Sequence, residues 1–307
     1  MKNLKISLES QIKKIAFLII AALPMVSCKG QVQEQKQQPE QKYCQLVKLE
    51  FSDPDAPQEL KERTVDRIKK NVQDKKQPID IRIENGSIVA KMLCDNNAGK
   101  YFRSGRFTIC ETYNASELTK AIDGIAEISN SRGIPFDSLL DRNTALVASI
   151  GTCAVADRDL FIKFVNLPEC KKLLPEDLIL ATGVPEDGGE TVPVFAVKMT
   201  KTPLITVDMM KNARTDLSYN EVNYDVLLEF KKEYKATWEA LTKKNSGKCL
   251  AIMLGDDVLS CPMLMGPIAN GKASISANMT KQQAEEMAQR INSSLPLEVV
   301  ISEVKML

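Results

Sequence analysis

Apolar residues follow two different periods in the first part of the chain. Residues 46–51 (LVKLEF) and 79–83 (IDIRI) alternate apolar and polar side chains, which is the pattern of a half-buried strand. Residues 59–72 repeat apolar side chains at helical spacing and carry charge on the opposite face, as an amphipathic helix does. Asn85-Gly86 is a strong hairpin-turn pair and precedes a further strand at 87–92. The pattern therefore predicts a strand, a helix and a hairpin.

A short helix at 95–103 and a strand at 106–112 extend this order to β-α-β-β-α-β, the split βαβ arrangement of ferredoxin-like folds. Beyond residue 118 helical and strand-like patterns are mixed. Helices are predicted at 121–132, 158–164, 232–243 and 281–292, and strands at 192–199, 222–230, 250–254, 258–260, 273–277 and 297–304. Thr280 is the expected N-cap of the last helix. We therefore expect an α+β fold.

The first thirty residues contain a short apolar run that ends at a cysteine. Residues 15–23 are apolar without interruption and follow four lysines. The run is shorter than the roughly 20 residues that a membrane-spanning helix needs, and it has the form of a secretory signal peptide. Met25-Val26-Ser27-Cys28 ends it and resembles the lipobox of bacterial lipoproteins, although Met25 stands where leucine is commonest. The resemblance implies a signal peptide at 1–27 and acyl chains, such as palmitate, on Cys28; the alternative is an ordinary signal peptide with an incidental cysteine.

Acyl chains on Cys28 would anchor the chain to a membrane of the cell envelope. Lys29, rather than an aspartate, follows the cysteine, and by analogy with lipoprotein sorting signals this favours the outer membrane over the inner one, with the folded part facing the periplasm. Residues 29–42 contain six glutamines and one apolar residue, so they cannot bury enough surface to fold. We therefore predict a flexible tether at 28–43, with a typical reach of roughly 20 Å.

Composition excludes several classes of function. The 307 residues include 41 basic and 40 acidic side chains, and this balance argues against a nucleic-acid-binding protein. The chain contains no histidine. A Ser-His-Asp triad, a Cys-His dyad, a histidine-ligated zinc site and a histidine proton shuttle are therefore all impossible.

The C-terminal third carries four stretches in the order and spacing of a known family. They are residues 202–213, 238–254, 255–275 and 279–301. They resemble segments of the first periplasmic domain of SecD and SecDF, accessory subunits of the Sec protein translocon. Residues 64–89 match this family more loosely, and 107–118 (FTICETYNASEL) resemble a strand of SecDF proteins from Bacteroidetes, which suggests that origin.

This resemblance implies two subdomains. A ferredoxin-like base would be built from both chain ends, at 44–118 and 272–307, and an α+β head at 119–271 would be inserted between them. The strand pattern divides the chain at the same places. In SecD this domain contacts the emerging preprotein, whereas proton coupling uses carboxylates in transmembrane helices, of which the sequence shows none. We therefore expect a SecD-like domain without the motor.

From these observations we expect a non-enzymatic, membrane-anchored lipoprotein that binds unfolded polypeptide or a Sec or envelope component. We expect it to need no cofactor or metal. Two alternatives stay open. One is a structural envelope lipoprotein that acts through self-association. The other is a hydrolase with Ser or Lys/Asp chemistry, which the absence of any nucleophile motif disfavours.

The candidate contact site is Met263-Leu264-Met265, which lies in a predicted loop bounded by Pro262 and Pro267. Methionine side chains adapt to varied partners, so an exposed Met-Leu-Met would suit polypeptide binding. The alternative is burial of this segment between head and base. Asp256-Asp257 at the tip of a hairpin is more typical of a solvated turn than of a metal site.

Seven cysteines follow Cys28, so at least one is unpaired within a single chain. Cys249 and Cys261 flank the predicted hairpin out of cross-strand register, and we expect both to be small buried hydrophobic residues. The pairs that could form disulfides in an oxidising compartment are Cys94 with Cys110 and Cys153 with Cys170.

Overall fold

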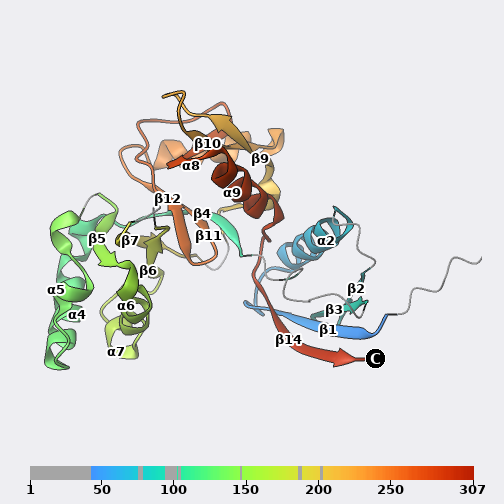
Figure 1. The fold of residues 1–307 in the computed structure, drawn as a ribbon, viewed down its shortest axis with the longest axis horizontal. Helices are drawn as coiled ribbons and strands as arrows, with labels where there is room; N and C mark the ends of the chain where they lie inside the picture. The colour runs from blue at the N-terminus through green and yellow to red at the C-terminus, as the bar shows by residue number, and fades with distance from the viewer. Residues whose placement is uncertain are drawn as a thin grey trace, which may run out of the picture. The chain divides into compact units, whose positions relative to one another are not determined.

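The computed structural model describes residues 43–74, 79–93, 102, 105–145, 147–185, 189–200 and 203–307 (Figure 1). The proposed signal peptide, Cys28 and the tether lie outside these residues, as do Cys94 and most of the helix predicted at 95–103. Within the described ranges the chain forms three sheets covered by helices. The predicted α+β class is therefore confirmed.

Both ends of the described chain meet in a four-stranded antiparallel sheet with the order β14-β1-β3-β2. Its strands are β1 (Gln45–Phe51), β2 (Asp80–Glu84), β3 (Ser87–Met92) and β14 (Val299–Met306). Asn85 and Gly86, both at positive φ, make the turn between β2 and β3 that their sequence predicts. The prediction that one sheet combines both chain ends is therefore confirmed.

Helix α2 (Gln58–Asp74) covers one face of this sheet (Figure 1). Its apolar stripe, made by Leu60, Val65, Ile68 and Val72, is buried in one cluster with β1 and β3 side chains. Strands β2 and β14 leave most of their outer side chains exposed. Because these elements are buried on one face only, their apolar residues recur with a clear period. The sequence therefore predicts both the strands and the helix.

A seven-stranded sheet with the order β5-β7-β6-β12-β11-β4-β8 occupies the middle of the described chain. Neighbouring strands are antiparallel except β12 and β6, which are parallel. The strands are β4 (Phe107–Glu111), β5 (Ser149–Ala154), β6 (Leu178–Gly183), β7 (Thr191–Lys198), β8 (Ile205–Thr206), β11 (Leu250–Leu254) and β12 (Asp257–Ser260).

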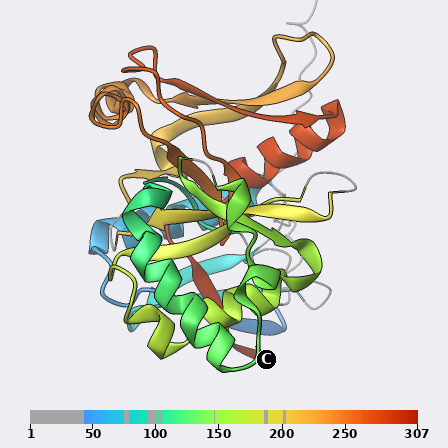
Figure 2. The same cartoon turned by 90° about the vertical axis from the view of Figure 1, so that its left-hand side faces the viewer.

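The β5-β7-β6 part of this sheet carries a layer of helices (Figure 2). Their apolar faces share one core cluster with strand residues such as Ile150 and Val194. The helices are α4 (Thr119–Ser131), α5 (Phe136–Leu139), α6 (Arg158–Val165) and α7 (Pro168–Lys171). Short 3-10 helices lie at Ala115–Leu118, Arg142–Thr144, Val155–Asp157, Val207–Met209 and Lys232–Tyr234.

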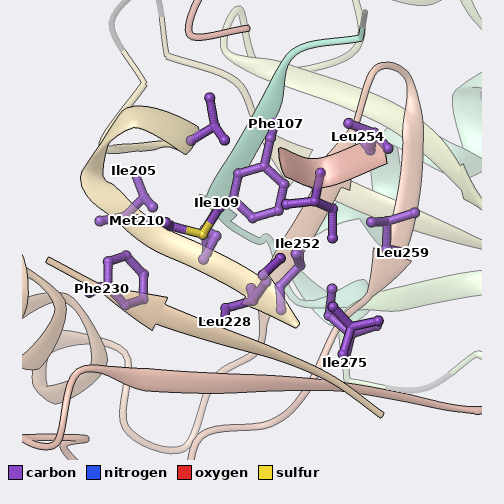
Figure 3. Packing of buried hydrophobic residues seen from close by; sticks show 14 of the residues in the cluster. Phe107, Ile109, Ile205, Met210, Leu228, Phe230, Ile252, Leu254, Leu259 and Ile275 are labelled. Atoms are coloured by element: carbon purple, nitrogen blue, oxygen red, sulfur yellow. The ribbon is translucent and has the colours of Figure 1, made fainter. Parts of the chain in front are cut away.

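A three-stranded antiparallel sheet with the order β13-β10-β9 packs over the β4-β11-β12 part of the seven-stranded sheet. Phe107 and Ile252 from the larger sheet and Leu228 and Ile275 from the smaller one share a buried cluster (Figure 3). The elements are β9 (Met210–Leu217), β10 (Tyr224–Phe230), β13 (Lys272–Met279), α8 (Lys235–Lys244) and α9 (Lys281–Ser293). Thr280 caps α9 as predicted, with its hydroxyl accepting the Gln283 N–H.

Two segments expected in the ferredoxin-like base lie in other sheets. The strand at 106–112 is β4, which pairs with β11 and β8. The assignment of this strand to the base is wrong: both faces of β4 are buried, as in an interior strand, and its sequence does not show which sheet supplies the partners. Strand β13 and helix α9 belong with β9 and β10, so β14 alone returns from residues 272–307 to the four-stranded sheet. The subdomain boundaries at 118 and 272 remain predictions.

Both disulfide pairings suggested by the sequence are wrong. Cys110, Cys153, Cys170, Cys249 and Cys261 are free thiols. Cys153 of β5 and Cys170 of α7 lie in the apolar cluster between the sheet and its helices, and Cys110 lies in the cluster on the opposite face of the seven-stranded sheet from Phe107. They act there as small buried hydrophobic side chains. Cys44, in contrast, is disulfide-bonded.

No helix among the described residues combines the length and apolar character needed to cross a membrane.

Candidate functional site

The segment 262–268, which follows β12, runs beside the residues that lead into β11. The Leu250 N–H donates to the Pro262 carbonyl at 3.2 Å, and the Leu264 N–H donates to the Lys248 carbonyl at 2.9 Å. These bonds extend the β11-β12 hairpin by a short antiparallel ladder. The candidate residues are therefore held on a rigid strand-like support rather than in an unpaired loop.

The three candidate residues alternate between inside and outside. Leu264 is only 5% exposed and belongs to the core between the seven-stranded and three-stranded sheets, whereas Met263 is 46% exposed and Met265 is 92% exposed. Alternation of this kind is expected for extended backbone, in which successive side chains point to opposite faces. The segment is thus anchored by Leu264 and presents its two methionines to solvent, a combination that neither sequence alternative describes by itself.

A groove of about 390 Å³ lies beside this segment. Its other walls come from helix α8, strand β11 and strand β13. Most of the lining side chains are apolar: Trp238, Leu250, Ile252, Pro262, Met263, Leu264, Met265, Gly266, Pro267, Ile268, Ala273 and Ser274 line it. The groove has the composition and size of a site for apolar groups.

Trp238 and Thr242 of α8 fix one wall of the groove. The Trp238 ring stacks on Phe230 with ring centroids 4.8 Å apart, and its Nε1–H donates to the Lys272 carbonyl at 3.2 Å. The Thr242 hydroxyl accepts the Ile268 N–H at 2.9 Å and so ties the far end of the segment to the helix. The sequence marked Trp238 as core packing; the structure shows that it also lines a groove, and no local motif announces that role.

The turn that carries Asp256 and Asp257 opens onto a larger, charged cleft of about 880 Å³. Asp257 is already paired with Arg158 of α6. The cleft also holds Lys163, Arg290, Asp159 and Asp256, so acidic and basic groups balance. Among the described residues no group of three or more carboxylate, thiol or imidazole side chains is placed to hold a metal ion. Asp256 lies in the turn, whereas Asp257 begins β12 and is ion-paired instead of simply solvated.

Polar contacts tie helix α2 to segments that flank the three-stranded sheet: the 3-10 helix before β9 and the end of α9. Arg63 pairs with Asp208 at 2.7 Å, and their side chains are 29% and 15% exposed. The Asn71 side-chain amide donates to the Ser293 carbonyl at the end of α9 at 2.7 Å. The Leu297 N–H donates to the Thr64 hydroxyl at 3.2 Å. These contacts connect the four-stranded sheet with the part of the molecule that carries the groove.

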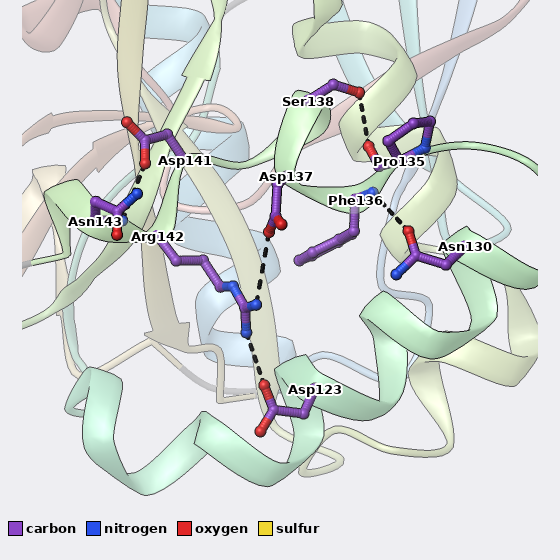
Figure 4. A network of polar contacts seen from close by, with 9 residues as sticks. All are labelled: Asp123, Asn130, Pro135, Phe136, Asp137, Ser138, Asp141, Arg142 and Asn143. Carbon is purple, nitrogen blue, oxygen red and sulfur yellow. Dashed lines mark hydrogen bonds and ion pairs between the residues drawn. The ribbon is translucent and has the colours of Figure 1, made fainter.

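A second polar network lies at the ends of α4 and α5 (Figure 4). Arg142 contacts Asp123 at 2.7 Å and Asp137 at 3.6 Å, and the Phe136 N–H donates to the Asn130 side chain at 3.1 Å. The three charged side chains are largely exposed. Exposed ion pairs of this type contribute about 0–1 kcal/mol to the stability of the fold. The network therefore adds little to the packing of α4 and α5, and it has no features of a functional site.

Comparisons with known proteins point to one family. Residues 183–297 match the family model described as "SecDF, P1 head subdomain". Three curated relatives are each called protein translocase subunit SecD. That of Calditerrivibrio nitroreducens is 29% identical over 48% of this chain and 28% of its own length. That of Thermobaculum terrenum is 32% identical over 37% and 22%, and that of Rickettsia typhi is 29% identical over 53% and 31%.

The chain therefore spans about a fifth to a third of the length of these relatives. Among solved structures, one described as a membrane component SecDF that enhances protein export aligns with a TM-score of 0.47 and 17% identity, over 85% of this chain and 100% of that one. SecDF in its super-membrane-facing form aligns with a TM-score of 0.45 and 17% identity, over 86% and 30%. On the sequence matches, the chain contains a SecD-like region that is similar to the periplasmic part of the family.

Proposed function

We propose that this protein is a non-enzymatic contact domain for polypeptide in protein export, anchored to the cell envelope. The proposal rests on where the groove lies in the chain. All twelve residues that line the apolar groove lie within 183–297, the part that matches the SecDF P1 head subdomain. The most SecD-like part of the chain is thus also the part that offers a surface for apolar side chains.

The groove suits an extended polypeptide of variable sequence. Its volume of about 390 Å³ lies within the size range of pockets that bind small apolar groups. Met263 and Met265 border it with unbranched, polarizable side chains that adjust to different shapes. The hydrogen-bonded ladder and Leu264 keep the backbone below them fixed. A rigid support with adaptable side chains favours broad rather than sequence-specific binding.

The proposal includes a lipid anchor on Cys28 and a periplasm-facing folded part, with the outer membrane favoured over the inner one. The tether 29–42 would hold the folded part clear of the lipid surface. The disulfide at Cys44 supports an oxidising compartment such as the periplasm. We further propose that the protein binds polypeptide, or a Sec or envelope component, without coupling this binding to proton flow.

One observation favours the alternative of a structural lipoprotein that acts through self-association. Strand β14 is an edge of the four-stranded sheet, and Val300, Val304 and Met306 are exposed on it. A long edge strand with exposed apolar side chains can pair with another strand. A second copy of the same edge would be the partner in this alternative.

Site-specific photo-crosslinking tests the two functions together. A photoreactive amino acid at Met265 of the full chain, expressed in the envelope, is expected to form adducts with exported polypeptides that persist when a protonophore collapses the proton gradient. The matched control is the same amino acid at Tyr219, which is also fully exposed but distant in sequence from the groove. Met263→Glu with Met265 carrying the probe is expected to reduce the adducts several-fold.

Equal adducts at Met265 and Tyr219 would refute polypeptide binding at the groove, and loss of the Met265 adducts with the protonophore would refute its independence from proton flow. A third probe at Val304 reports the alternative. Homodimeric adducts at Val304, together with none at Met265, would replace the contact function with self-association.

A further inference from the structure

Sulfur-containing side chains gather on one face of the ladder that supports the candidate segment. Cys249 and Met263 face each other as an antiparallel pair. The hydrogen bonds on either side, from Leu250 to Pro262 and from Leu264 to Lys248, make this a non-hydrogen-bonded pair. In such pairs the Cα atoms are about 4.5 Å apart and the two side chains approach most closely. The Cys249 thiol and the Met263 thioether therefore project side by side.

Cys261 adds a third sulfur to this face. Since Cys249 pairs with Met263, Cys261 lies diagonally across the ladder from Cys249, and both cysteines are free. Cys261 is two residues before Met263, and Met265 is two residues after it, so the alternation that buries Leu264 on the opposite face puts all three on the same side. The spacing Cys-x-Met-x-Met is thus combined with a cross-strand cysteine, which only the fold brings in.

The chemistry of these donors selects the ligand. Thiolates and thioethers are soft ligands that favour Cu(I), whereas carboxylates and water suit hard cations. The chain contains no histidine, so a soft transition-metal ion must be held by sulfur here. We propose that Cys249, Cys261 and Met263 form a Cu(I)-binding site, with Met265 as a further thioether ligand. The proposal does not rest on polypeptide binding, although Met263 and Met265 belong to both sites.

Both cysteines are free thiols, so each has an S–H bond whose proton a metal ion can replace. Binding exchanges these protons for the metal: two S–H bonds break, two S–Cu bonds form, and Cu⁺ with two thiols gives a bis-thiolate Cu(I) complex and two protons. No electron is transferred. The ion has a route to the site, because Met263 and Met265 are exposed and Cys261 is only partly buried. Burial of Cys249 then keeps one ligand away from solvent oxidants.

The test is an anaerobic titration of the reduced full chain, purified in detergent, with Cu(I) in competition with a chromophoric Cu(I) chelator. We expect one equivalent that resists the chelator and an X-ray absorption spectrum with sulfur as the sole near neighbour of copper. Cys249→Ser with Cys261→Ser is expected to weaken binding of this equivalent roughly 100-fold or more, and Met263→Leu about tenfold. Met263→Leu changes an exposed side chain, so its folding should be unaffected.

The matched control is Cys153→Ser with Cys170→Ser, which removes two other free thiols and should leave the tight equivalent unchanged. Tight binding that survives in the Cys249→Ser, Cys261→Ser variant would overturn the proposal, as would nitrogen or oxygen neighbours in the absorption spectrum. Alkylation and mass spectrometry of protein taken directly from the envelope give an independent check. A quantitative Cys249–Cys261 disulfide there would overturn the site as well, whereas two alkylatable thiols support it.

Discussion

The four-stranded and seven-stranded sheets bury their strands in different ways. In the four-stranded sheet, α2 covers one face, and outer strands such as β14 leave most side chains exposed. In the seven-stranded sheet, all five residues of β11 are buried, because the three-stranded sheet packs on one face and a second apolar cluster lies on the other. A strand that is buried on one face alternates apolar and polar residues, whereas a strand that is buried on both faces is apolar throughout and shows no alternation.

Both candidate sites lie on the more deeply buried of these two sheets. The groove and the sulfur cluster both lie on the extension of β11 and β12, where backbone position is fixed by strand pairing. The four-stranded sheet contributes no lining residue to either described cleft. Precise placement of a few side chains therefore coincides with the more deeply buried sheet, as expected for sites built on rigid elements.

The largest expected effect comes from the interior of the seven-stranded sheet. Phe107 is fully buried in the cluster that joins β4 to the three-stranded sheet (Figure 3). Phe107→Ala is expected to lower the free energy of unfolding by about 3–5 kcal/mol, because it removes a buried ring and leaves a cavity. Urea denaturation followed by the fluorescence of Trp238, the only tryptophan, measures it.

Val300→Ala on β14 is the control, since its side chain is half exposed and its loss should cost less than about 1 kcal/mol. Similar costs for Phe107→Ala and Val300→Ala would contradict the difference in burial between the two sheets.

An intermediate effect is expected where α2 meets the 3-10 helix that precedes β9. A double-mutant cycle on Arg63→Ala and Asp208→Ala is expected to give a coupling of about 1–2 kcal/mol, because this pair is mostly shielded from water. The same cycle on Arg142 and Asp123, a solvent-exposed pair with the same N–O distance of 2.7 Å, should give a coupling of less than about 1 kcal/mol. Equal couplings in chemical denaturation would show that burial does not separate the two pairs.

The smallest effect is a pH dependence at the edge of the helical layer. The Tyr113 hydroxyl donates to Asp177 at 2.7 Å, and this hydrogen bond, with burial and the charge of Asp177, raises the pKa of Tyr113 to about 12 from 10.0. A raised pKa adds stability that is complete below pH 10 and lost as the pH rises through about 12. Tyr113→Phe is expected to remove this component of the decline in thermal stability between pH 10 and 12.

Tyr219→Phe, at a fully exposed position, is the control for this change and should leave the alkaline decline as it is. An unchanged pH profile in Tyr113→Phe would mean that the hydrogen bond to Asp177 does not form in solution.

Several elements were predictable because their causes are local. The Asn85-Gly86 turn, the Thr280 cap and the amphipathic stripe of α2 each depend on residues a few positions apart. Strand β9 was missed, because its sequence MKNARTDL is mostly polar and its strand state comes from pairing with β10. Asn292 of α9 also holds β9 in place. Its side-chain amide donates to the Ala213 carbonyl at 2.7 Å, and its side-chain oxygen accepts the Ala213 N–H at 2.8 Å.

The candidate site was predicted in part for the same reason. The sequence drew attention to Met263, Leu264 and Met265, but their alternate exposure depends on the ladder with residues 247–250. The walls supplied by Trp238, Ala273 and Ser274 come from other elements and carry no motif. Polypeptide contact at these residues stays a prediction that the crosslinking experiment tests.

By itself the sequence determined the α+β class, the exclusion of histidine chemistry and the SecD-like pattern of the C-terminal third; that both chain ends meet was implied by the family resemblance. These follow from periodicity, composition and motif order, which need no knowledge of long-range contacts. Tertiary structure alone decided that β4 pairs with β11, that Cys110, Cys153 and Cys170 remain thiols, and that Cys249 pairs with Met263 on the face that Cys261 shares. Strand pairing across long sequence separations fixes these neighbours, and a linear pattern of apolar and polar residues does not specify which distant strand provides the partner.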